Sequence, residues 1–180
     1  MKKVVASIIA VAMVLVLANG CSTVGQTTYK GFNSVKAFKI VNAPAAKSSL
    51  HFEKTLTPGQ GGVVSGSYTI GNVQVTYTVT VPAGALHNTE TVTIDIPDVT
   101  EAREDLGPSP YTFNKPVTVT MSFKNLPNVP DPSDIQVAWF DANAGEWIVV
   151  PSTATVSGND LTVTYNTSHF TYWIIIDPDE

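Results

Sequence analysis

The sequence predicts an all-β fold, an antiparallel β-sandwich, from two observations. Apolar residues alternate with threonine and other polar residues in several separate stretches. This is the period that turns one side of a strand toward a core and the other toward water. The stretches are short, and residues typical of turns separate them, with no convincing helical pattern in between. Many short strands of this kind are typical of two antiparallel sheets packed face to face.

The clearest alternating stretch is 73–81, where valine and tyrosine on one side oppose threonine and glutamine on the other. Branched and aromatic residues opposite threonine suit a strand that is buried on one side only. The same pattern recurs at 92–96, 117–123, 135–139 and 161–165.

Two segments between these stretches predict hairpin loops, because 141–145 and 157–160 consist largely of Asp, Asn, Gly and other small residues. The last stretch, 170–176, is apolar on both sides. A strand of that composition is expected inside a sheet or beneath a covering segment.

The first twenty residues have the pattern of an export signal. Lys2 and Lys3 precede an uncharged apolar run at 4–17, and small residues follow at 18–20. The apolar run of about 14 residues is shorter than the roughly 20 that a helix needs to span a bilayer. We therefore expect residues 1–20 to be a signal peptide that is removed.

Cys21, the only cysteine of the chain, comes directly after this signal. The sequence Leu17-Ala18-Asn19-Gly20-Cys21 resembles the lipobox of bacterial lipoproteins, although that family prefers leucine three places before the cysteine, where Ala18 stands. The resemblance implies a diacylglycerol on the Cys21 thiol, with palmitate as an expected acyl chain. Two acyl chains hold a protein on a membrane where one chain binds only marginally. With this thiol used, the mature chain forms no disulfide.

Charge divides the mature chain into a basic and an acidic part. Segment 21–48, expected to be a lipidated tether, carries four lysines and no acid, whereas the chain from Ser49 onward has a net charge of −11. The lysines either lie against anionic head groups, at about 1 kcal/mol each, or only keep the tether soluble. An acidic body makes nucleic acid an unsuitable partner. The four lysines are Lys30, Lys36, Lys39 and Lys47.

Within this tether the apolar residues leave the local structure open. Phe32, Val35, Phe38 and Val41 recur at helical spacing, while 37–41 fits a short strand equally well. Segment 42–47 contains Pro44 and interrupts either pattern, so the main domain is expected to occupy 49–180.

Four local motifs occur in order along that domain: Gly61-Gly62-Val63-Val64, Val81-Pro82-Ala83-Gly84-Ala85-Leu86, Phe113-Asn114-Lys115-Pro116-Val117-Thr118-Val119 and Thr167-Ser168-His169-Phe170-Thr171. Together they resemble the ZU-five domain, the β-sandwich of ankyrins, netrin receptors, zonula occludens proteins and some bacterial surface proteins. The resemblance covers about residues 58–176. It implies a protein-interaction or scaffolding module, and therefore a protein partner that the sequence does not name.

The prolines and glycines of these motifs also have structural interpretations. Val81-Pro82 is expected to end a strand, because proline has no amide proton for the ladder, and Pro116 is expected at the first position of another strand. Gly84 suits a reversal where a Cβ would clash.

Self-cleavage is the one catalytic activity that the resemblance suggests. Some relatives cut their own chain within a His-Phe-Ser sequence. In this chain His169 would be the base, Thr171 the nucleophile, and the bond between Phe170 and Thr171 the one that breaks. The alternative is that His169 bonds to a loop while Phe170 begins the last core strand. No conventional hydrolase or phosphate-binding motif is present, so we otherwise expect no enzyme activity.

No metal or cofactor is predicted. His51, His87 and His169 lack the spacing of a metal site, and the acids Asp131, Asp134 and Asp141 match no calcium loop.

Sugar binding is a third alternative, resting on the tryptophans. Trp139 shares a side with Ile135 and Val137 and is expected in the core, whereas Trp147 follows a loop and is expected at the surface.

The sequence as a whole thus predicts a lipid-anchored protein of the cell envelope, acting as a non-catalytic binding or structural module. Ser22 follows the cysteine, and it is not the aspartate that retains many lipoproteins in the inner membrane. In a cell with two membranes we therefore expect the outer one. The sequence leaves the oligomeric state open.

Overall fold

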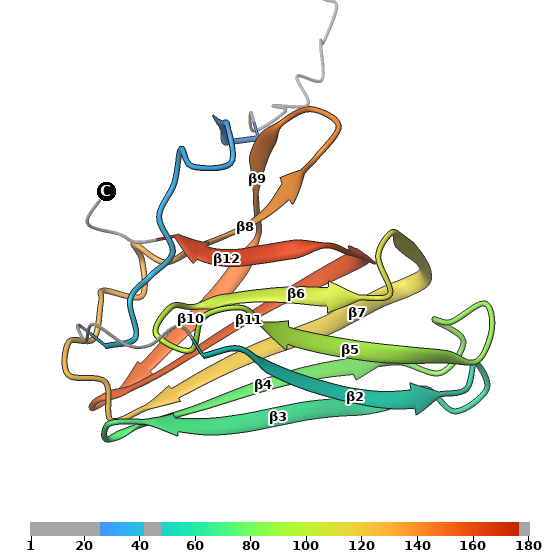
Figure 1. Ribbon diagram of the computed structural model, residues 1–180, viewed down its shortest axis with the longest axis horizontal. Helices are drawn as coiled ribbons and strands as arrows, with labels where there is room; N and C mark the ends of the chain where they lie inside the picture. Colours follow the sequence, from blue (N-terminus) through green and yellow to red (C-terminus); the bar gives the residue numbers. More distant parts are fainter. Residues whose placement is uncertain (1–25, 42–47, 177–180) are drawn as a thin grey trace, which may run out of the picture.

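The protein is a sandwich of two antiparallel sheets, seen in a computed structural model that describes residues 26–41 and 48–176 (Figure 1). The predicted all-β class is therefore confirmed. The signal peptide and Cys21 lie outside the described residues. Within those residues no helix has the length and hydropathy needed to cross a membrane.

Among residues 26–41 and 48–176, twelve strands form the two sheets. One sheet has seven strands in the order β1-β9-β8-β12-β6-β5-β2, and the other has five in the order β10-β11-β7-β4-β3. In chain order the strands are β1 (Thr28–Lys30), β2 (Leu50–Leu56), β3 (Gly62–Ile70), β4 (Val73–Val81), β5 (Glu90–Ile96), β6 (Arg103–Gly107), β7 (Tyr111–Lys124), β8 (Gln136–Asp141), β9 (Glu146–Val150), β10 (Ser152–Ser157), β11 (Asp160–Phe170) and β12 (Tyr172–Ile176).

The main core lies between the two sheets and is filled by the apolar side of each alternating stretch. Strand β4 shows the pattern most fully, because every second residue from Val73 to Val81 is buried and the residues between them are not. The predicted hairpin loops are also present, between β8 and β9 and between β10 and β11. Gly145 and Gly158 adopt the positive φ that such turns require.

The last predicted strand proves to be two. Strand β11 ends at Phe170 in the five-stranded sheet, and β12 begins at Tyr172 in the seven-stranded sheet, so the chain changes sheets at Thr171. Trp173 then faces the main core, while Ile174 belongs to a second apolar cluster on the outer face of the seven-stranded sheet. The expectation that this stretch is covered on both sides is confirmed.

Much of the predicted tether belongs to the folded domain. Strand β1 pairs with β9, and the segment 31–40 that follows, here named the N-terminal strap, places Val35, Ala37, Phe38 and Ile40 in buried positions. The strap is neither a helix nor a regular strand, and its β-pairing consists of two isolated bridges, Ala37 to Ile176 and Lys39 to Glu101. The expected boundary at residue 48 is therefore wrong for this stretch, because its apolar side chains complete the second cluster and join the main core.

Prolines and glycines act as predicted at one motif and differently at another. Strand β4 ends at Val81 before Pro82, and Gly84 adopts a positive φ of 79°, as a reversal there requires. A Cβ on Gly84 would lie 3.1 Å from the Lys115 ammonium nitrogen. Pro116, expected to begin a strand, instead lies inside β7. It falls where the register against β11 shifts between Thr167 and His169, and such an irregularity tolerates the missing amide proton.

Candidate functional site

The outer face of the five-stranded sheet carries many hydroxyl-bearing side chains, and its three central rows are here named the hydroxyl face. The threonines predicted to face water lie on adjacent strands, so they line up across the sheet in rows. One row is Thr153, Thr164, Thr120, Thr78 and Ser65; the next is Thr155, Thr162, Ser122, Thr76 and Ser67; a third is Asn166, Thr118, Thr80 and the exposed Val63. Neighbours are spaced about 4.8 Å across strands and about 6.7 Å along them.

Side chains within a row bond to one another. Thr120 and Thr164 share a hydrogen bond of 3.2 Å between their hydroxyl groups, and Thr118 donates to the side-chain oxygen of Asn166 at 2.9 Å. None of the residues in these three rows is charged. Charged residues make up about 25–35% of a typical soluble surface. A neutral partner could therefore contact these rows without desolvating charged side chains.

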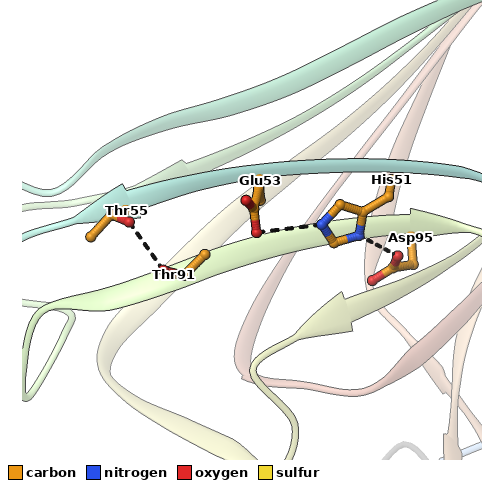
Figure 2. Close-up of polar contacts among 5 residues, drawn as sticks. All are labelled: His51, Glu53, Thr55, Thr91 and Asp95. Atoms are coloured by element: carbon orange, nitrogen blue, oxygen red, sulfur yellow. Dashed lines mark hydrogen bonds and ion pairs between the residues drawn. The ribbon is translucent and has the colours of Figure 1, made fainter.

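The outer face of the seven-stranded sheet carries charges where β2 lies beside β5. Figure 2 shows His51 between two carboxylates, with its Nδ1 2.6 Å from Asp95 and its Nε2 3.4 Å from Glu53. Hydrogen bonds to Asp95 and Glu53 raise the pKa of His51. Farther along the same pair of strands, Thr55 and Thr91 share a hydrogen bond of 3.0 Å. All these side chains are exposed or partly exposed.

The histidines and acids weighed as metal ligands have other roles. Among residues 26–41 and 48–176 no group of three or more His, Cys, Asp or Glu side chains is arranged to hold a metal ion. Asp131 accepts bonds from the backbone and hydroxyl of Ser133, and Asp141 accepts from the backbone of the β8–β9 loop. His87 bonds to the Thr112 carbonyl. The aspartates thus stabilise turns.

Trp147 is not the exposed aromatic residue that the sequence predicted. Its side chain is 2% exposed, and its indole N–H donates to the Phe32 carbonyl at 2.9 Å. The Phe32 ring, itself 45% exposed, lies 5.6 Å from that of Trp147. The prediction failed because the strap, more than a hundred residues earlier in the chain, covers this part of the sheet. Trp139 does pack against the main core as expected.

The segment His169-Phe170-Thr171 forms the corner at which the chain changes sheets. The Phe170 carbonyl accepts a hydrogen bond from the Ser109 hydroxyl at 3.1 Å, and the Thr171 hydroxyl donates to the Phe140 carbonyl at 3.4 Å. The His169 ring lies edge-on to Trp139 at 4.4 Å, and its Nε2 has no hydrogen-bond partner. Burial lowers the pKa of His169 and keeps its ring neutral near pH 7.

A neutral histidine beside the bond is what the self-cleavage hypothesis needs. The hypothesis also needs that ring to take the proton of the nucleophile, and the described hydrogen bonds aim the Thr171 hydroxyl at Phe140 instead. His169 and Thr171 thus lie at the same corner, but no hydrogen bond is found between them among the described residues.

Sequence reasoning missed one buried ionisable group, Glu104 on β6. Its side chain is 0% exposed, and it accepts a hydrogen bond of 2.7 Å from the Tyr165 hydroxyl across the core. Its strand is hidden in the sequence by the charged run Arg103-Glu104-Asp105. The usable signal was the alternation of Ala102, Glu104 and Leu106, which are all buried.

No protein-family model and no curated protein matches this chain.

Proposed function

We propose that the chain is a lipid-anchored protein of the cell envelope, acting as a non-catalytic binding or structural module. The lone Cys21 after an export signal supports the anchor. Strand β1 starts at Thr28, and seven residues span at most about 25 Å. A lipid on Cys21 would therefore keep the domain close to the membrane surface.

The observation that carries the binding role is the hydroxyl face. Its three rows carry no charge, and several of its side chains bond to a neighbour in the same row. An ordered surface loses little side-chain entropy when it binds. The face would serve a neutral partner, and we expect that partner to be a protein.

The anchor is tested by fractionating cells that express the wild-type chain or Cys21→Ser. The wild-type chain should follow the membrane fraction, and the variant should be soluble and folded, because it loses only its lipid. A variant that remains in the membrane pellet, or that fails to fold, contradicts the proposal.

The binding face is tested by placing a photo-crosslinking residue at Thr120, with Thr91 on the other sheet as the matched control. Crosslinked adducts of discrete mass are expected in intact cells from position 120 and not from position 91. Equal adducts from both positions, or none from position 120, reject the face as the binding surface.

Self-cleavage between Phe170 and Thr171 is the competing function. The Ser109 bond to the Phe170 carbonyl favours it, because a donor there stabilises charge that develops on that oxygen. Intact mass of the purified protein decides between the two: one uncut species that persists for days supports the non-catalytic proposal. Two fragments that disappear in Thr171→Ala support cleavage.

A further inference from the structure

Glu104 links the two sheets through the middle of the core. The carboxyl group comes from β6 of the seven-stranded sheet, and the Tyr165 hydroxyl that bonds to it comes from β11 of the five-stranded sheet. Trp173 on β12 is the cross-strand neighbour of Glu104, and its ring stacks on that of Tyr165 at 4.5 Å. The carboxyl group is therefore enclosed by three strands.

Only one of the two carboxyl oxygens has a partner. Oε1 accepts the Tyr165 bond, whereas Oε2 of Glu104 has no hydrogen-bond partner among the described residues. The Trp173 indole N–H, in the same core, also has no hydrogen-bond partner in the part of the chain that the structure describes. A buried carboxylate with a single donor and an unpaired oxygen carries a large desolvation cost.

The ionisable groups around Glu104 supply no positive charge to offset that cost. Tyr165 and Tyr77 interact with it from β11 and β4, and Tyr68 on β3 stacks on Tyr77. His169 reaches this group only through the ring of Trp173, at a centroid distance of 5.7 Å. Its imidazole is neutral near pH 7, because burial lowers its pKa. Burial, opposed only by the Tyr165 bond, raises the pKa of Glu104 to about 7.

We propose that Glu104 is a proton-operated switch within the sandwich: it bridges the sheets as a neutral acid, and release of its proton to solvent loosens the contact of β6 and β12 with β11. The protonated form puts no net charge in the core. The ionised form draws water toward Oε2, which separates the rings of Tyr165 and Trp173. The domain is then tighter in mildly acidic surroundings than in neutral or alkaline ones.

The direction of the pH dependence follows from proton binding. Because the pKa of Glu104 is raised from 4.5 to about 7 in the folded protein, the folded state holds more protons than the unfolded state between these values. The contribution of Glu104 to stability is thus fully present below pH 4.5 and is lost as pH rises through 7. The pKa difference corresponds to a folding equilibrium constant that falls roughly 300-fold across this window.

Urea unfolding of the purified mature protein between pH 4.5 and 8 measures this loss. The background variant is His51→Gln, because His51 titrates in the same range. In this background, Glu104→Gln should flatten the dependence of the free energy of unfolding on pH. Asp105 is the next residue on β6 but lies outside the core. Asp105→Asn should therefore retain most of the loss of stability with rising pH. A profile that is unchanged by Glu104→Gln overturns the proposal.

Infrared spectroscopy follows the proton directly. The wild-type protein at pH 6 should show the carbonyl band of a protonated carboxylic acid, which disappears with a midpoint near 7 and is absent in Glu104→Gln. Tyr165→Phe should raise that midpoint, because the Tyr165 bond favours the ionised form. A midpoint near 4.5, or one that Tyr165→Phe leaves unmoved, contradicts the switch even if Glu104→Gln does not fold.

Discussion

The outer faces of the two sheets are covered in different ways. On the seven-stranded sheet, β8, β9 and β12 turn apolar and aromatic side chains outward, and the N-terminal strap closes over them. The neighbouring β2 and β5 carry the charges around His51 instead. On the five-stranded sheet, the side chains of the hydroxyl face stay exposed or partly exposed within the described residues. Its three rows carry no charge.

The difference shows what each composition requires. Outward apolar residues need a cover, because large exposed apolar patches are unfavourable in a soluble domain. Outward threonines need none, since their hydroxyl groups bond to one another or to water while their methyl groups suit the pleated surface. We therefore expect substitutions on the covered face to cost stability and those on the hydroxyl face to affect binding.

The largest expected effect comes from Trp147→Ala. The substitution leaves a cavity under the strap and removes the bond to the Phe32 carbonyl, so the free energy of unfolding should fall by about 3–5 kcal/mol. Urea unfolding measures the fall, and faster hydrogen exchange at the Phe38 amide would show release of the strap. A loss below about 1 kcal/mol would mean that the strap contributes little to this face.

A smaller loss is expected from Phe32→Ala. The ring contacts Phe140 and Tyr172 as well as Trp147, at centroid distances of 5.0, 5.5 and 5.6 Å. Because the side chain is nearly half exposed, its removal should lower the free energy of unfolding by about 1 kcal/mol. The same unfolding assay applies, with Phe140→Leu as a companion variant. A loss equal to that of Trp147→Ala would contradict the expectation that the half-exposed Phe32 contributes less stability than the buried Trp147.

Thr120→Val should change stability still less. Valine keeps the shape and removes one hydroxyl pair with Thr164, and a cross-strand pair of this kind contributes about 0.2–1 kcal/mol. If the hydroxyl face serves binding, this variant should unfold almost as the wild type does. A photo-crosslinking residue at the neighbouring Thr78 should then give less adduct in the variant than in the wild-type background. A stability loss of several kcal/mol would make the face structural.

The smallest effect is expected from His51→Gln, and it depends on pH. The carboxylates of Asp95 and Glu53 raise the pKa of His51 in the folded protein, so its stabilising contribution is present below pH 6.5 and is lost as pH rises through the folded pKa. The variant should be less stable than the wild type at pH 5.5 and nearly equal to it at pH 8.5. Thermal unfolding at the two pH values tests this, and equal effects at both would contradict the assignment.

The alternating stretches were sufficient to predict β4, β7 and β11 of the five-stranded sheet, because each has one apolar side and one threonine side. They did not include β3 and β10 of the same sheet. They were not sufficient for the strap. Phe32, Val35 and Phe38 recur at helical spacing, whereas 37–41 fits a short strand equally well. The backbone bonds that decide the outcome join Phe38 to Ile175 and Ala102, far along the chain.

The candidate sites differ in the same way. The sequence placed threonine on the wet side of several strands, but that those strands are neighbours in one sheet depends on topology. The burial of Trp147 depends on a segment 115 residues away. Glu104 lies in a charged run of the sequence. Its side chain is buried because β6 pairs with β5 on one side and with β12 on the other, inside the seven-stranded sheet.

The attachment of the strap also decides how the domain responds to force. A pull on the N-terminus acts first on β1, which is held to β9 by only three residue pairs at the edge of its sheet. The load then passes to the Phe32 contacts and to the bridge between Ala37 and Ile176. Because these connections lie one after another along the chain, we expect them to separate in turn, before tension reaches the long pairing of β7 with β11. The strap should therefore detach under force while the two sheets stay folded.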